Sequence, residues 1–532
     1  MINNMAENIL AEKYQQKTDL EHVLDNPDTY TGSMENTNID TYVMNDNKII
    51  AKEIDIIPGL YKLFDEGIVN CRDHQVRMNL AMKNCSANIM PVTTIEVNIK
   101  DDIITMFNDG NGIDIAKHPE CKLWIPEMIF GHLRTSTNYN KNEKKIVGGK
   151  NGFGFKLVLI WSEWGEIETV DHVRGLKYTQ RFENNLNNIK EPSITKCKTK
   201  PFTKVTFKPD YKRLGLSGLS KDMIDLFTRR TYDIAAVTDK KVKVKYNNTL
   251  VPIKTFQQYV DLYIGTKDEK ARIYEEANER WEYAVCIAPK EEFTQVSFVN
   301  GIYTGKGGNH VNYIQNQIVR KLCAYIKKKK KIDVKPSTIK EQLMLFVRCD
   351  INNPTFDSQT KDYMNTAISK FGSTCEVSEK FIEKIAKIGV MDAACALTEV
   401  KDKECAKKTD GSKSKNIRGI PKLIDANFAG GNESDKCTII LCEGDSAKAG
   451  IVSGLSKEDR NYIGVYPMKG KLFNVRGENQ KRIFENKEIT EIKRILGLES
   501  GKIYTDKDIK TKLRYGSVLF MTDQDLDGSH IK

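Results

Sequence analysis

The chain has 532 residues, 39% of them hydrophobic and 29% charged, and its 83 lysines and arginines exceed its 72 aspartates and glutamates by 11. So long a chain does not fit one hydrophobic core, and this composition is typical of packed globular proteins, which excludes disordered and membrane-embedded classes. Residues 1–19 are polar and lack the apolar core of a secretion signal. We therefore expect a multidomain protein that is not secreted and has no membrane partner, with a positive charge that favours polyanionic partners.

The first part of the chain, to about residue 268, mixes helical and strand patterns. Apolar positions in 60–71 have helical spacing, and 93–99 and 103–108 alternate as half-buried strands do. Glu66 and Asn70 are four residues apart, so a helix places both on one face. A carboxylate there could activate water and an amide oxygen could hold Mg²⁺ bound to phosphates. A helix with a solvated polar face would have the same pattern.

Two glycine-bearing segments lie in the same region. The segment 108–112 follows a strand, and Asn108 offers a short polar side chain to an adenine edge, although a plain turn has the same composition. The segment 148–156 places a glycine-rich loop before an apolar helical stretch, where exposed amides cradle phosphates. It is not a Walker A sequence, because no Gly-Lys-Ser/Thr ends it, and a flexible loop is the alternative.

A second α/β pattern follows, with strand patterns at 281–288 and 295–299 and a helical pattern at 310–329. This helix runs into five lysines, 327–331, which usually form a solvated face at a helix C-terminus. The stretch 401–415 is rich in Lys, Asp and Ser without apolar periodicity, which predicts a linker or exposed loop.

Beyond residue 437, two short apolar strand patterns, 438–442 and 517–521, each run into a loop that carries carboxylates. The first loop carries Glu443, and the second carries Asp523, Asp525 and Asp527 at alternating positions. Carboxylates at strand ends converge on one side and bind hard cations such as Mg²⁺ through oxygen. An EF-hand calcium loop begins with a similar pattern, but the bidentate glutamate that it needs is absent within the chain.

In order and spacing, the three segments around Glu66, Asn108 and Gly149 resemble the Bergerat fold of the GHKL ATPases. The segments 16–18, 20–22, 27–30, 129–133 and 353–361 are similar to those of the eukaryotic-type DNA topoisomerases II, over essentially the whole chain. The resemblance implies an α+β multidomain protein. Its parts would be a GHKL ATPase domain with an N-terminal arm (1–268), a ribosomal-S5-like transducer domain (269–400), a linker (401–436) and a partial TOPRIM α/β domain (437–532).

The resemblance also assigns roles to individual residues. Glu66 and Lys361 would be catalytic, Glu66 as the base and Lys361 against the γ-phosphate. Nucleotide contacts would come from Asn70, Asn108, Ser136, Thr137, Asn138, Gly149, Lys150, Asn151, Gly152, Phe153, Gly154, Phe155, Lys156, Gln359, Thr360 and Lys361, and from Tyr14 in the partner subunit's site. Metal ligands would be Asn70, Glu443, Asp523, Asp525 and Asp527. DNA contacts would be Lys327, Lys328, Lys329, Lys471 and Asn474.

Three residues depart from the family's pattern: Gly67 stands where an aliphatic residue is usual, His74 where asparagine is common, and Lys469 where arginine is usual. The resemblance implies a homodimeric DNA topoisomerase that uses ATP and Mg²⁺ and passes double-stranded DNA through a transient break, with this chain as its ATP-binding clamp. The catalytic tyrosine of the family is missing, so we expect that this chain alone does not cut DNA. The alternatives are the large subunit of a split topoisomerase and a non-cleaving GHKL clamp. The expected compartment is the nucleus or, for a viral protein, the host cell.

Overall fold

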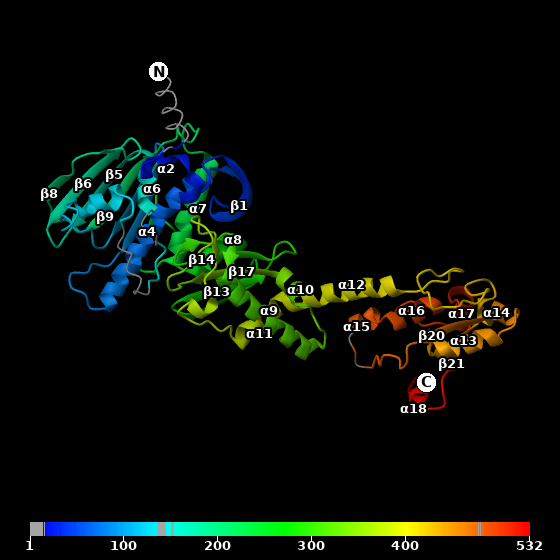
Figure 1. Cartoon of the computed structure of the whole chain (residues 1–532). Helices are drawn as coiled ribbons and strands as arrows, with labels where there is room; N and C mark the ends of the chain where they lie inside the picture. Colours follow the sequence, from blue (N-terminus) through cyan, green and yellow to red (C-terminus); the bar gives the residue numbers. More distant parts are fainter. Residues whose placement is uncertain are drawn as a thin grey trace, which may run out of the picture. The chain divides into compact units, whose positions relative to one another are not determined.

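The computed structural model describes residues 14, 16–135, 145–149, 154–476, 478 and 480–531, apart from the side chains of 480, 481 and 527 (Figure 1). The chain divides into two compact units, Met1–Tyr325 with Ile339–Met391 and Ile326–Thr338 with Asp392–Lys532. We call them the first and the second unit. Within the described residues, no helix has the length and apolar character that crossing a membrane requires.

A nine-stranded, mainly antiparallel sheet forms one part of the first unit, in the order β11-β10-β3-β4-β9-β5-β6-β7 with β8 paired to β6. Its strands are β3 (Thr94–Lys100), β4 (Ile103–Asp109), β5 (Ser162–Asp171), β6 (Leu176–Glu183), β7 (Asn188–Ile189), β8 (Ser193–Lys196), β9 (Phe202–Pro209), β10 (Lys243–Tyr246) and β11 (Thr249–Leu250). Burial alternates along β4, as it does in a strand with one face on a core. The strands predicted at 93–99 and 103–108 are confirmed as β3 and β4.

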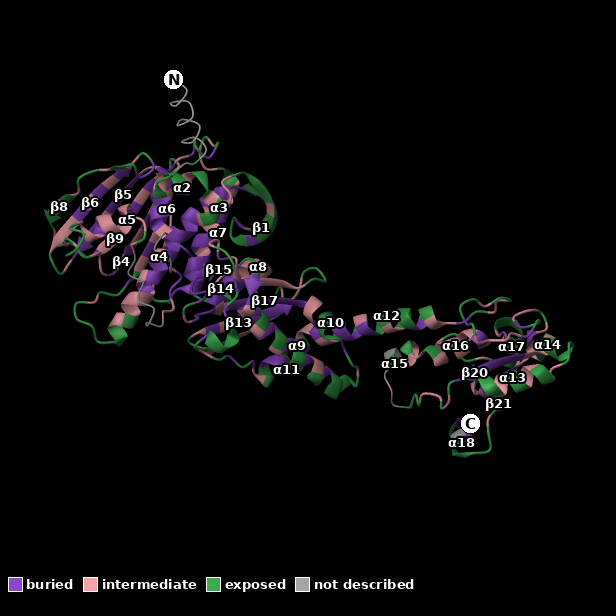
Figure 2. Ribbon diagram, viewed as in Figure 1, coloured by how far each residue is buried: buried purple, intermediate pink, exposed green. Residues whose placement is uncertain are grey.

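Three helices, α4 (Pro58–Lys83), α6 (Gly154–Ile160) and α7 (Lys221–Val237), pack on this sheet and on one another (Figure 1). The predicted helix at 60–71 is confirmed as part of α4, which begins with Pro58 at a position that suits the fixed φ of proline. The first half of α4 is buried (Figure 2). Within it, Phe64 stacks on Phe227 of α7. Glu66 is only 5% exposed, so the alternative of a solvated polar face is wrong.

Further elements complete this part of the first unit. They are α2 (Asp19–Asp25), α3 (Pro27–Tyr30), the hairpin β1 (Thr37–Asn45) with β2 (Lys48–Ile56), α5 (Ile125–Gly131) and α8 (Phe256–Ile264). Thr18 and Glu21 form a capping box that starts α2. The hairpin packs on α7, so it extends the core on that side.

A five-stranded sheet forms the other part of the first unit, in the order β12-β13-β17-β14-β15. Its strands are β12 (Arg272–Asn278), β13 (Trp281–Ile287), β14 (Thr294–Val299), β15 (Ile302–Tyr303) and β17 (Leu343–Cys349). Between β15 and β17 the chain forms the helices α9 (Asn309–Lys330) and α10 (Pro336–Glu341), and α11 (Glu379–Ile385) follows β17. Phe207 of the first sheet and Phe298 and Phe346 of the second belong to one hydrophobic core. This shared core fixes the loops of the second sheet beside α4.

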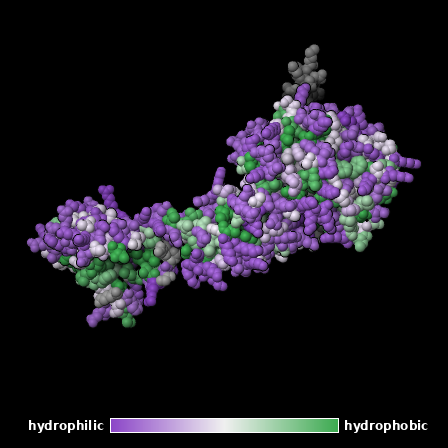
Figure 3. Space-filling model, turned by 180° about the vertical axis from the view of Figure 1, so that it is seen from behind, coloured by the Kyte–Doolittle hydropathy of each residue, from purple (hydrophilic) through white to green (hydrophobic). Residues whose placement is uncertain are grey.

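The second unit contains a parallel three-stranded sheet in the order β20-β19-β21. Its elements are β19 (Thr438–Glu443), α13 (Gly444–Gly454), α14 (Asp459–Tyr462), β20 (Ile463–Met468), α15 (Gln480–Glu485), α16 (Lys487–Leu496), α17 (Asp506–Lys512), β21 (Ser517–Met521) and α18 (Leu526–Ile531). Strands alternate with helices, as a parallel sheet requires. β21 exposes its apolar side chains, and hydrophobic residues gather on one face of this unit (Figure 3).

Of the linker or exposed loop predicted over 401–415, the loop is wrong for its first part, and the linker stays a prediction. Residues 401–409 are the end of helix α12 (Met391–Thr409). The helix has almost no apolar stripe, so apolar periodicity could not reveal it. Strong helix formers such as Ala, Lys and Glu favour it, and Lys407 and Lys408 in the last turn suit the negative end of the helix dipole.

Candidate functional site

The first unit contains a cavity of about 440 Å³, a volume typical of small-molecule sites. Its lining brings together α4, the end of β4, the glycine-rich segment with α6, and the loop after β17. The predicted residues in the lining are Glu66, Asn70, Asn108, Gly149, Gly154, Phe155, Lys156, Gln359 and Lys361. Segments far apart in sequence therefore meet around one cavity, as the resemblance implied.

Two ammonium groups hold the carboxylate of Glu66. Its Oε1 accepts a hydrogen bond from Lys361 Nζ at 2.7 Å and forms an ion pair with Lys62 Nζ at 3.1 Å. Burial by itself would raise the pKa of Glu66, but Lys361 and Lys62 outweigh it and hold this pKa below its usual range. Glu66 is therefore ionised at neutral pH.

A second carboxylate, on the preceding residue of α4, extends this cluster of buried charges. Asp65 pairs with Lys62 at 2.9 Å and with Arg230 Nε at 2.7 Å. Burial would lower the pKa of Lys62, yet Asp65 and Glu66 raise it above its usual range. The cluster fixes α4 to α7 and to the loop that carries Lys361. Removing one partner from such a buried pair leaves an uncompensated charge, which is strongly destabilising.

The beginning of the glycine-rich segment is anchored to α4 by Asp73. The fully buried Asp73 carboxylate accepts hydrogen bonds from the backbone N–H of Gly148 at 2.9 Å and of Gly149 at 2.8 Å. Gly154 opens α6 so close to Glu66 that an added Cβ would lie 2.8 Å from Oε2. A glycine at this position therefore lets the backbone approach the carboxylate.

His74 lines the cavity where the family commonly has asparagine. Burial lowers the pKa of His74 to about 4, so its ring is neutral at pH 7. Its Nε2 is buried and has no hydrogen-bond partner among the described residues. This nitrogen lies beside Gly110, where an added Cβ would be 3.2 Å away.

Gly67, another departure from the family's pattern, also lines the cavity. A Cβ at this position would lie 2.4 Å from the Met106 sulfur. The long Met106 side chain thus occupies the space that a larger residue at position 67 would need.

Some predicted nucleotide residues lie elsewhere. Ser136, Thr137, Asn138, Lys150, Asn151, Gly152 and Phe153 lie outside the described residues. Of the predicted residues that are described, Tyr14 and Thr360 are not part of the cavity lining. Tyr14 is 70% exposed, and the Thr360 hydroxyl donates to Asp362 at 3.0 Å.

Sequence reasoning missed Lys62, Asp73 and Arg77. Lys62 lies four residues before Glu66 on the same face of α4, a spacing that could have revealed it. Arg77 lines the cavity three residues after His74. Nothing in the sequence indicated that Asp73 binds the glycine-rich segment, because the two are far apart along the chain.

The strand ends of the second unit carry the predicted metal ligands. β19 and β21 are parallel neighbours, with Cys442 opposite Met521, so Glu443 and the loop with Asp523 begin at the same edge. Glu443 Oε2 is buried and has no hydrogen-bond partner among the described residues, as suits a cation ligand. The described residues nevertheless contain no group of three His, Cys, Asp or Glu placed to hold a metal ion, and the side chain of Asp527 lies outside them.

The predicted DNA contacts lie on the surface of the second unit. Lys327, Lys328 and Lys329 are exposed in the last turn of α9, where Lys327 pairs with Asp333 at 3.7 Å. Lys471 and Asn474 are exposed in the loop after β20. Exposed lysines of this kind suit contacts to phosphates that carry no sequence information.

Comparisons with known proteins agree on one family. A model described as DNA gyrase B matches residues 255–411, and a Toprim domain model matches 438–532. DNA topoisomerase 2 of Acanthamoeba polyphaga mimivirus is 45% identical over 98% of this chain and 41% of its own length, and that of Pisum sativum is 44% identical over 99% and 36%. The chain thus spans about two fifths of the length of these relatives.

Solved structures match about three quarters of the chain. The ATPase region of Saccharomyces cerevisiae topoisomerase II is 40% identical, with a TM-score of 0.68, over 73% of this chain and all of that structure. The ATPase and transducer domains of DNA topoisomerase II from Balamuthia mandrillaris are 38% identical, with a TM-score of 0.68, over 74% of this chain and 99% of that structure.

Proposed function

The chain belongs to the type II DNA topoisomerases, and we propose that its cavity binds and hydrolyses ATP to operate a clamp on double-stranded DNA. The observation that carries the proposal is the contact of Lys361 with Glu66 at 2.7 Å. It joins a loop of the second sheet to the helix that carries the base. Hydrolysis in one part of the first unit can therefore act directly on the other.

The cavity has the groups that a nucleoside triphosphate needs. Asn108, at the end of β4, would bind the adenine edge, and it lines the cavity together with His74. The amides of the glycine-rich segment would bind phosphates. Mg²⁺ bound at Asn70 would neutralise part of the phosphate charge.

Glu66 acts as the general base that takes a proton from the attacking water. Its carboxylate is ionised, and Lys361 and Lys62 hold it. A triphosphate in the cavity competes with Glu66 for the ammonium of Lys361, because it carries more negative charge. Lys361 then stabilises the charge that develops on the γ-phosphate, while Lys62 keeps Glu66 in place.

The second unit would contribute DNA contacts and a metal site. Lys327, Lys328, Lys329, Lys471 and Asn474 would contact DNA through its backbone. Glu443, Asp523, Asp525 and Asp527 would hold Mg²⁺ near a scissile phosphate. The protein would form a homodimer in which the Tyr14 arm reaches the partner's nucleotide. It would act in a nucleus or in a virus-infected cell. The Toprim match favours this proposal over a non-cleaving clamp.

The test is Glu66→Ala. We expect ATP hydrolysis to fall at least ~100-fold, the scale of losing a general base, while ATP still binds. Steady-state turnover and nucleotide affinity measure the two. The control is Glu53→Ala, which removes an exposed carboxylate on β2 and is expected to change neither quantity. Hydrolysis by Glu66→Ala within tenfold of the unchanged protein would contradict the assignment of the base.

A further inference from the structure

The turn between β14 and β15 is built from Asn300 and Gly301. Val299 pairs with Ile302, which leaves a two-residue turn, and both turn residues have positive φ, 52° and 79°. Asn-Gly is the sequence that best suits such a turn. Yet hairpin tips usually face solvent, and Asn300 is fully buried. The local geometry of the turn therefore does not explain why it is buried.

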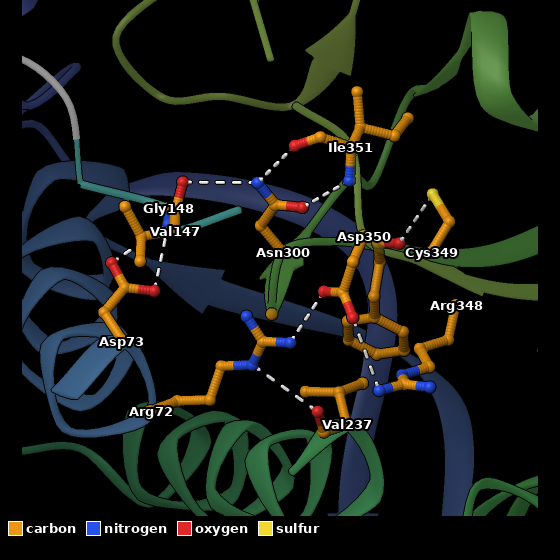
Figure 4. A network of polar contacts seen from close by, with 12 residues as sticks. Arg72, Asp73, Val147, Gly148, Val237, Asn300, Arg348, Cys349, Asp350 and Ile351 are labelled. Atoms are coloured by element: carbon orange, nitrogen blue, oxygen red, sulfur yellow. Dashed lines mark hydrogen bonds and ion pairs between the residues drawn. The ribbon is translucent and has the colours of Figure 1, made fainter. Parts of the chain in front are cut away.

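The Asn300 side chain joins two separate segments of the chain (Figure 4). Its Nδ2 donates to Val147 O at 3.2 Å and to Ile351 O at 2.9 Å, and its Oδ1 accepts from Ile351 N–H at 2.7 Å. The same two segments meet again through Asn353, whose N–H donates to Lys145 O at 2.9 Å and whose Oδ1 accepts from Lys145 N–H at 3.1 Å. The contacts hold 145–147 beside 351–353.

Each of these segments leads directly into the cavity. Val147 is followed by Gly148 and Gly149, whose amides bind the Asp73 carboxylate of α4. Ile351 lies ten residues before Lys361, which contacts Glu66. Asn300 therefore contacts both the residues that precede the glycine-rich segment and the start of the loop that carries Lys361.

Buried charges hold the turn from its other side. Arg72 Nη2 pairs with Asp350 at 2.8 Å, and Arg230 Nη2 donates to Gly301 O at 2.7 Å (Figure 4 shows the first pair). A Cβ at Gly301 would lie 2.5 Å from Arg72 Cδ, so the turn tip is in close contact with α4. The turn is thus fixed to the helix that carries Glu66 as well as to both loops.

We propose that Asn300 is a positioning residue that holds the glycine-rich segment and the Lys361 loop in one fixed relation, so that phosphates bound by the first meet the ammonium of the second. Asn300 lies outside the cavity lining and acts through the two backbone segments that it joins. The inference rests on the proposed ATPase activity, since it concerns how that cavity is assembled.

The test variant is Asn300→Gly, because glycine accepts the positive φ and only the side chain is lost. We expect kcat/KM for ATP to fall at least ~10-fold, the scale of losing one or two buried hydrogen bonds, mainly through kcat. The matched control is Asn248→Gly in the β10–β11 turn. Asn248 also has a positive φ, 63°, but uses its backbone N–H to bind Asn98. The control is expected to keep the parent's kinetics.

Two further measurements separate positioning from a merely structural role. Hydrogen exchange of Asn300→Gly without nucleotide is expected to speed up at 145–149 and 351–361 together. Lys361→Ala is expected to cost less in kcat in the Asn300→Gly background than in the parent, because the lysine is already misplaced. Exchange that changes in one segment only, or additive losses in kcat, would overturn the proposal.

If Asn300→Gly does not fold, Asn353→Gly takes its place, since it removes the side-chain contact to Lys145 and keeps the backbone hydrogen bond to the same residue. The same pattern of exchange is then expected, with a smaller loss in kcat. If the parent protein, without any substitution, neither binds nor hydrolyses ATP, the proposed function is refuted. The hydrogen-exchange measurement without nucleotide would still decide whether Asn300 joins the two segments.

Discussion

The cavity of the first unit and the strand ends of the second unit both carry carboxylates, but the protein balances their charge differently. In the cavity, Glu66 is buried and matched by Lys361 and Lys62. At the strand ends, Glu443 Oε2 is buried without a hydrogen-bond partner among the described residues, and Asp523 and Asp525 are exposed.

The difference teaches how each site responds to a ligand. A buried carboxylate requires a counter-charge, which either the protein or a bound cation supplies. The cavity supplies its own through Lys361 and Lys62, so the nucleotide must compete for Lys361. The strand ends lack one among the described residues, so a cation from solution should change them most.

Lys62→Met tests the internal balance of the cavity and has the largest expected effect. It leaves Asp65 and Glu66 with one cation fewer in a buried cluster, so we expect a loss of ~3 kcal/mol or more in the free energy of unfolding. Denaturant unfolding measures the loss. Lys422→Met, which breaks the exposed pair with Asp445 in the second unit, is the control and should cause no measurable change. Equal losses in the free energy of unfolding for Lys62→Met and Lys422→Met would show that the buried cluster is no more sensitive than an exposed pair.

Acid should weaken the first unit through His74. Its folded pKa is about 4, below the unfolded value of about 6.5, so the unfolded chain binds more protons between these values and stability falls as the pH falls through this window. From pH 7 to pH 5 the expected contribution is about 2 kcal/mol. Unfolding of the parent and of His74→Asn at both values measures it. His310 titrates in the same direction and remains in both proteins, so a pH slope that is identical in the two would rule out His74.

Mg²⁺ without nucleotide should act on the second unit. We expect slower hydrogen exchange at 438–443 and 517–525 on addition of millimolar Mg²⁺, because the ion binds the folded strand ends. Glu443→Gln should abolish the effect. Asp445→Asn is the matched control, since this neighbouring carboxylate pairs with Lys422 instead. Protection that persists in Glu443→Gln would mean that the ion binds elsewhere.

The smallest expected effect is the difference in stability between alanine substitutions at two helical glycines, one in each unit. Gly450 of α13 has nothing within 4 Å of an added Cβ, so Gly450→Ala should stabilise the protein by up to about 1 kcal/mol through helix propensity. Gly67→Ala should gain less or lose stability, because its Cβ meets Met106. Thermal unfolding compares them. A larger gain for Gly67→Ala would show that Met106 moves aside without cost.

Much of the local structure followed from the sequence, because short-range backbone geometry sets it. Alternation predicted β3 and β4, and helical spacing predicted α4 with Glu66 and Asn70 on one face. The same reasoning missed the helix at 401–409, whose exposed residues have no apolar stripe.

Contacts between distant segments were decided by the tertiary structure. The sequence motif singled out Lys361, but only the shared core of the two sheets places its ammonium on Glu66. The Asn300–Gly301 pair predicts a tight turn by itself, yet its burial against Val147 and Ile351 depends on how the second sheet packs against α4. At the strand ends the order of β19 and β21 brings the loops to one edge, while the positions of the carboxylates depend on loop conformation and on bound cations, which alternation in sequence does not encode.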